Sequence, residues 1–107
     1  MNDYDAFARL DTTIAARKGT APSDSWTAQL LSKGPEKCAE KFGEEAIEAI
    51  IEAVRGDRDK LVSEAADAIY HLAVMLAAQN LALSDVAAEL ARREGRSGIT
   101  EKAARSG

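Results

Sequence analysis

The fold is decided by residues 42–80, FGEEAIEAIIEAVRGDRDKLVSEAADAIYHLAVMLAAQN. Apolar side chains recur at helical spacing on both sides of Gly56-Asp57, a dipeptide of the kind that ends one helix and begins another. We therefore expect two long helices, over about residues 35–55 and 58–80, joined by a tight turn. The second is apolar around most of its circumference, which is typical of a helix at the centre of a bundle or an interface.

Working outward, glycine, proline and serine mark the ends of the other expected helices. These helices cover about residues 3–18, 25–32 and 84–94, with Ser25 and Ser84 as N-caps. An irregular basic tail is expected over about residues 95–107. Alanine fills 22 of the 107 positions and proline only 2, a composition that favours helix over sheet. The sequence predicts one all-α domain over residues 1–107, a bundle of four to five helices.

Composition and charge exclude several classes of protein. Fourteen basic and 18 acidic residues give a net charge of −4, so the chain lacks the basic footprint of a nucleic-acid-binding protein. A single cysteine, Cys38, excludes an intrachain disulfide and a Cys-based zinc cage, and we expect it to be buried. The chain has no signal-peptide pattern and no membrane-spanning apolar run, so we expect a cytoplasmic protein.

Acidic residues gather on one side of each long helix. Glu45 and Glu48 are three residues apart on the first, and Glu64 and Asp67 repeat that spacing on the second. Antiparallel packing across the turn brings the four together, with Asp67 expected to be largely removed from water. We call these four residues the acidic ridge. Because converging like charges destabilise a fold unless a cation bridges them, we predict a divalent-ion site. All-oxygen ligands favour Mg²⁺, with Mn²⁺ as an alternative, over zinc.

A simpler interpretation of the same acids is a solvated helix face on a non-catalytic helical interaction module. The second pair of acids, Glu64 and Asp67, lies on a helix that is otherwise apolar, and this favours the metal site over the alternative. For Glu44 the sequence leaves open a ligand role and a hydrogen-bonding support role. The remaining acids of the first long helix, Glu36, Glu40 and Glu52, are expected to be surface or helix-terminus charges.

The order of these motifs resembles that of a known family. The matching segments are Ser25-Trp26-Thr27-Ala28, Lys33-Gly34, Lys37-x-x-Glu40-Lys41-x-Gly43-Glu44-Glu45-Ala46, Glu64-Ala65-Ala66-Asp67-x-x-Tyr70-His71-Leu72 and Arg92-Arg93-x-x-Arg96-Ser97-Gly98-Ile99. Together, from about Tyr4 to Ile99, they are similar to the phosphoribosyl-ATP pyrophosphatase family of the all-α (MazG-like) nucleoside triphosphate pyrophosphatase superfamily. The acidic motif alone indicates only the superfamily. The lysine-rich segment before it and the Arg-Ser-Gly segment after it are what point to phosphoribosyl-ATP as the substrate.

The resemblance implies the second step of histidine biosynthesis. In that step phosphoribosyl-ATP is hydrolysed between its α- and β-phosphates to phosphoribosyl-AMP and pyrophosphate. It also supports a homodimer, whereas the sequence by itself shows only an excess of apolar surface. The cyclohydrolase domain fused to some relatives does not fit in this chain. The nearest alternative is a house-cleaning pyrophosphatase that acts on ordinary or damaged (d)NTPs.

The acidic residues and the family resemblance together predict roles for individual side chains. We expect Glu45, Glu48, Glu64 and Asp67 to hold the metal, and Glu44 or Glu48 to serve as the catalytic base. The expected phosphate-binding residues are Lys33, Lys37, Lys41, Arg93 and Arg96, with solubility, ion pairing or contact with a partner subunit as the alternatives. His71 either donates a ring N–H to a carboxylate that binds the metal, and so orients it, or is a hydrogen-bonded core histidine. Trp26 either stacks on a purine or anchors the short helix, and Tyr70 is expected to pack.

Overall fold

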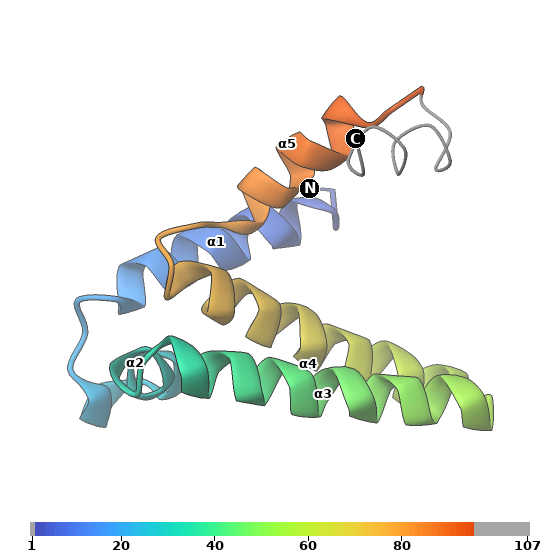
Figure 1. The fold of residues 1–107 in the computed structure, drawn as a ribbon, viewed down its shortest axis with the longest axis horizontal. Coiled ribbons are helices and arrows are strands. Elements are labelled where there is room, and N and C mark those ends of the chain that lie inside the picture. Colours follow the sequence, from blue (N-terminus) through green and yellow to red (C-terminus); the bar gives the residue numbers. More distant parts are fainter. Residues whose placement is uncertain (1, 96–107) are drawn as a thin grey trace, which may run out of the picture.

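A computed structural model describes residues 2–95, and all regular secondary structure within this range is helical (Figure 1). The helices are α1 (Asp5–Arg17), α2 (Trp26–Ser32), α3 (Pro35–Arg55), α4 (Arg58–Ala77) and α5 (Leu83–Arg92), with a 3₁₀ turn at Pro22–Asp24. The all-α prediction is thus confirmed. The expected basic tail beyond residue 95 lies outside the described residues. Among the helices that are described, none has the length and apolarity to cross a membrane.

Helices α3 and α4 form an antiparallel hairpin, the most extensive helix pair of the described chain. Pro35 begins α3, where its missing N–H costs no hydrogen bond. Gly56 ends α3 with a left-handed φ of 79°, and its N–H donates to the carbonyl of Glu52 at 3.0 Å. Asp57 then caps α4 by accepting a hydrogen bond from the N–H of Lys60 at 3.1 Å. The predicted turn between the two long helices is therefore present.

The end of α4 and the start of α5 differ from the prediction. Helix α4 stops at Ala77 instead of Asn80 because Asn80 adopts a left-handed φ of 62° and closes the last turn. Ser84 is not the N-cap of α5; that position is Ala82. Its capping acceptor comes from α1, where the Asp11 carboxylate accepts from the N–H groups of Leu83 at 2.8 Å and Ser84 at 3.0 Å.

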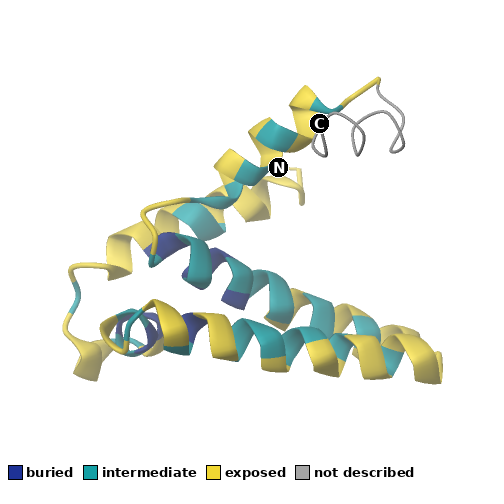
Figure 2. Cartoon of the chain, in the orientation of Figure 1, coloured by how far each residue is buried: buried dark blue, intermediate teal, exposed yellow. Residues whose placement is uncertain are grey.

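The core lies where α1 and α2 meet the C-terminal half of α4 (Figure 2). Its buried members are Ile14, Leu30, Cys38, Ala73, Val74 and Ala77. The other end of the hairpin has no such cover, and Ile47, Ile50 and Val54 are between 58% and 84% exposed. Figure 1 shows α1 and α5 diverging from it. The radius of gyration, 15.8 Å, accordingly exceeds the roughly 13 Å of a compact 100-residue domain.

Candidate metal centre and active site

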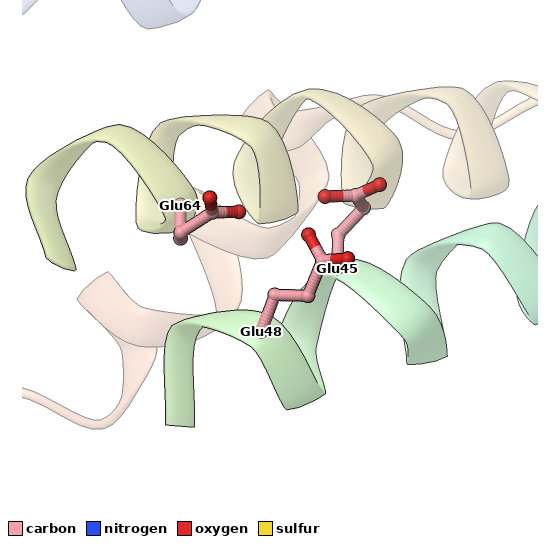
Figure 3. A group of neighbouring side chains, drawn as sticks. All are labelled: Glu45, Glu48 and Glu64. Atoms are coloured by element: carbon pink, nitrogen blue, oxygen red, sulfur yellow. The ribbon is translucent and has the colours of Figure 1, made fainter. Parts of the chain in front are cut away.

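Three carboxylates converge between α3 and α4, at the boundary between the core and the uncovered end of the hairpin (Figure 3). Glu45 and Glu48 extend from successive turns of α3, and Glu64 reaches toward them from α4. One oxygen from each lies within 4.8 Å of the others. We call these three residues the carboxylate cluster. Oxygen atoms at this spacing suit a hard divalent cation such as Mg²⁺.

Mutual repulsion and burial disturb the protonation of the cluster. Burial raises the pKa of Glu45, and the charge of Glu48 raises it further. The pKa of Glu64 is also raised, chiefly by a hydrogen bond shared with Glu48 and then by burial. One oxygen of Glu64, Oε2, is buried without any hydrogen-bond donor. Protons can hold such a cluster together at low pH, but near neutrality a cation does so better.

Asp67 lies beside the carboxylate cluster but is not one of its three members. Its charge contributes to the raised pKa of both Glu45 and Glu64, so it belongs to the same electrostatic site. Its expected burial is wrong, because the side chain is exposed. Glu48 on α3 is exposed as well, so the acidic ridge is accessible to solvent from both helices of the hairpin.

Glu52 was expected as a surface or helix-terminus charge, and it is found in the last turn of α3 but not on the surface. The Glu52 side chain is only 13% exposed, and its Oε1 is buried without a hydrogen bond, 3.7 Å from the Arg55 Nε. It lies one turn beyond Glu48 on the same side of α3, a spacing visible in the sequence. Glu44 instead forms an ion pair with Lys41, whose ammonium lies 3.1 Å from its Oε2.

The lysines precede the carboxylate cluster along α3. A hydrogen bond to Glu44 and the charge of that residue raise the pKa of Lys41, so Lys41 stays cationic beside the cluster. Lys37 is half-buried and pairs with Glu40 at 3.4 Å, the intrahelical pairing that was the alternative to phosphate binding. Lys33 lies in the loop before α3, with its Nζ 5.8 Å from the ring centroid of Trp26.

His71 is buried on α4, one turn beyond Asp67. Its Nδ1 is buried without a hydrogen-bond partner among residues 2–95. Burial lowers the pKa of His71, and the nearby ammonium of Lys41 lowers it further, while Asp67 and Glu44 oppose the shift. The imidazole is therefore held neutral close to the acidic ridge. Cys38 is buried as expected.

Of the two arginines expected at phosphate, one is described. Arg93 follows α5, where its Nε donates to the Glu89 carboxylate at 2.9 Å. Helix α5 packs on α1 and lies away from the carboxylate cluster (Figure 1), so the fold does not bring Arg93 to the cluster within one chain. Arg96 lies outside the described residues.

Comparison with known proteins places this geometry in a family. The profile described as "Phosphoribosyl-ATP pyrophosphohydrolase" matches residues 7–94, a range that contains every described site residue. The chain belongs to this family. The family resemblance predicted from the sequence is thereby confirmed.

Individual relatives agree over nearly their whole length. The chain is 74% identical over 98 residues to the phosphoribosyl-ATP pyrophosphatase of Dinoroseobacter shibae, covering 92% of this chain and 96% of the relative. It is 75% identical over 97 residues to the protein of the same name from Paracoccus denitrificans, covering 91% and 90%. A third such protein, from Ruegeria pomeroyi, is 74% identical over 96 residues, covering 90% and 91%.

Proposed function

We propose that this chain hydrolyses phosphoribosyl-ATP between its α- and β-phosphates, releasing phosphoribosyl-AMP and pyrophosphate. Two supports are independent of each other. Relatives at 74% and 75% identity carry the name phosphoribosyl-ATP pyrophosphatase. The observation that carries the chemistry is the carboxylate cluster, whose oxygens lie within 4.8 Å of one another. The reaction is the second step of histidine biosynthesis, and we place it in the cytoplasm.

The proposed cofactor is Mg²⁺, with Mn²⁺ as an alternative. Glu45, Glu48 and Glu64 would hold the ion, and Asp67 would add a fourth carboxylate from the adjacent turn of α4. The donors fit such an ion, because all are carboxylate oxygens and Glu64 Oε2 is buried without a hydrogen bond. When bound, a divalent ion neutralises phosphate oxygens and acidifies water.

The protein's own groups orient the reactants. Glu48 is exposed at the edge of the carboxylate cluster and is the first choice to accept the proton of the attacking water. Glu44, the second choice, must first leave its ion pair with Lys41. Lys41 and Lys37 lie one and two helical turns before Glu45 on α3. From there their ammonium groups can bind phosphate oxygens and stabilise the pyrophosphate leaving group. Lys33 extends this row of cations.

His71 is assigned a supporting role next to the acidic ridge. A neutral, buried imidazole with a free nitrogen can take a hydrogen bond once a ligand rearranges Lys41 or Asp67. Partners of this kind orient the groups that bind a metal or substrate, and their loss typically costs about 10- to 100-fold in affinity or activity.

A homodimer completes the proposal. The exposed apolar side chains of α3 and a groove of about 400 Å³ between α1 and α4, lined by Phe7, Leu10, Val62 and Ile69 among others, are surfaces that a second copy would bury. Arg93 would then reach phosphate from the neighbouring subunit, and a phosphate-binding role for Arg96 remains a prediction from the sequence. The part of this proposal that concerns the arginines depends on the dimer.

A pyrophosphate-release assay tests the proposed function. With Mg²⁺ present, we expect turnover of phosphoribosyl-ATP to exceed that of every member of a (d)NTP panel in kcat/KM. A preference for the panel would instead identify a house-cleaning pyrophosphatase. If the folded protein hydrolysed none of these substrates, the result would support the alternative of a non-catalytic helical interaction module.

A further inference from the structure

Trp26 is the one tryptophan of the chain and the first residue of α2, and its role is not explained by packing. Its side chain remains 50% exposed, although Leu30, one turn later in the same helix, is fully buried. Of the two roles that the sequence left open for Trp26, anchoring α2 therefore does not account for its exposed half. The residues that anchor the helix are its buried neighbours.

The neighbour of Trp26 fixes its position relative to the acidic ridge. The Thr27 hydroxyl and the Tyr70 hydroxyl form a short hydrogen bond, 2.5 Å long, which joins the first turn of α2 to α4. Tyr70 lies six residues beyond Glu64, or about 9 Å along the helix axis. Because α3 and α4 are antiparallel, this is also the direction in which Lys41 lies from Glu45. Along the hairpin axis, the first turn of α2 is thus level with the lysine end of the acidic ridge.

A cation accompanies the indole at this position. The Lys33 Nζ lies 5.8 Å from the Trp26 ring centroid, within the range of a cation–π contact. Trp26 begins α2 and Lys33 follows its last residue as the C-cap, and the Lys33 side chain reaches back to the indole. An aromatic face beside an ammonium is a chemistry suited to a nucleotide, whose base stacks and whose phosphates pair with cations.

We propose that Trp26 is the stacking surface for the purine base of the substrate, and that Lys33 pairs with an anionic group of the same molecule. This inference rests on the proposed function. One ligand then lies along the hairpin, with its scissile phosphates at the carboxylate cluster, other phosphate oxygens at Lys41 and its base on Trp26. Trp26 is accordingly a specificity-determining residue that separates a nucleotide from inorganic pyrophosphate or a sugar phosphate.

The single indole makes the inference directly observable. Intrinsic tryptophan fluorescence of the full-length protein is titrated with AMP and, separately, with pyrophosphate, both with Mg²⁺. We expect AMP to quench the emission saturably, because a base stacks on the ring, and pyrophosphate to leave it unchanged. Equal responses to both ligands, or none to AMP, would overturn the proposal.

Kinetics with phosphoribosyl-ATP give a second readout. Trp26→Leu is expected to raise KM at least about fivefold, the lower end of the effect of losing one base–aromatic stack. Trp26→Phe keeps a stacking face and should stay within about twofold of wild type. Leu81→Ala, which trims another half-exposed apolar side chain away from the acidic ridge, is the matched control and should leave KM unchanged.

Two results would contradict the inference without touching the proposed function. One is a wild type that hydrolyses phosphoribosyl-ATP while Trp26→Leu keeps the same KM. The other is a Trp26→Leu variant whose only defect, by light scattering, is a changed oligomeric state, which would make Trp26 a subunit contact. A wild type without activity on phosphoribosyl-ATP would instead defeat the proposed function, and the AMP titration would still test the indole.

Discussion

At the scale of single residues, the carboxylates of the site destabilise the folded chain when they are ionised. Glu64 has a raised pKa and an oxygen without a donor, so the folded chain binds a proton at this carboxyl more tightly than the unfolded chain does. A carboxyl whose folded pKa is raised contributes stability at low pH that is lost as pH rises from its unfolded value through its folded value. Near neutral pH, repulsion within the carboxylate cluster therefore opposes folding until a cation binds.

Removing one carboxylate charge tests whether repulsion within the carboxylate cluster destabilises the fold. With EDTA at pH 7.5, we expect Glu64→Gln to raise the melting temperature above that of wild type, because it removes repulsion in the cluster. With excess Mg²⁺ the order should reverse, since only wild type gains from binding. Glu36→Gln, at an exposed acid of α3, is the control for loss of one negative charge and should not change the order. If Glu64→Gln were less stable than wild type in EDTA, the claim that repulsion destabilises the metal-free protein would be refuted.

The one histidine allows a clean pH experiment. Burial lowers the pKa of His71 below its ordinary value, so the unfolded chain takes up a proton before the folded chain does. Stability should fall as pH drops from about 6.5 through the folded pKa of His71. Urea unfolding between pH 7.5 and 5.5 should show this loss in wild type, and His71→Gln should flatten the slope. Equal slopes in the two proteins would show that His71 titrates normally.

The sequence located these residues better than it described their surroundings. Spacing at i and i+3 correctly brought Glu45, Glu48 and Glu64 together, because helix geometry alone decides which side chains share a face. It missed the exposure of Asp67 and the burial of Glu52, because both depend on which other elements cover each edge of the hairpin.

At the scale of elements, local signals predicted the helix ends where the cap is local. Pro35, Gly56 and Ser25 act as expected, since each serves its own helix. The start of α5 was wrong because its capping group, Asp11, is on α1, more than 70 residues away in the chain. No pattern within the α5 segment indicates such a cap.

The long-range cap predicts a measurable stability change. Asp11→Ala leaves the N–H groups of Leu83 and Ser84 without their acceptors and should lower the free energy of unfolding by about 1 kcal/mol. Asp3→Ala, an exposed acid before α1, should change it by less than about 0.5 kcal/mol. Chemical denaturation of the two variants checks this. Equal stabilities would show that the Asp11 cap contributes nothing.

At the scale of the whole molecule, the described chain is open, with apolar side chains exposed on the outer face of the hairpin. The sequence predicted this excess but not where it would lie. We expect wild type to be a dimer by light scattering. Ile50→Lys should shift the protein toward monomer, because it places a charge in the apolar surface that the second copy would bury. Thr13→Lys, at an exposed polar position of α1, is the control and should remain dimeric. A wild type that is monomeric at micromolar concentration would contradict the proposed assembly.

The central claim is that the acids between α3 and α4 exist to hold a divalent ion, and isothermal titration calorimetry with Mg²⁺ tests it most directly. Wild type should bind saturably, and binding should tighten when pyrophosphate is present. The double substitution Glu48→Gln with Asp67→Asn should abolish both the heat of binding and turnover, the latter by at least about 100-fold. A wild type that shows no heat with Mg²⁺ or Mn²⁺, even with pyrophosphate present, would contradict the account.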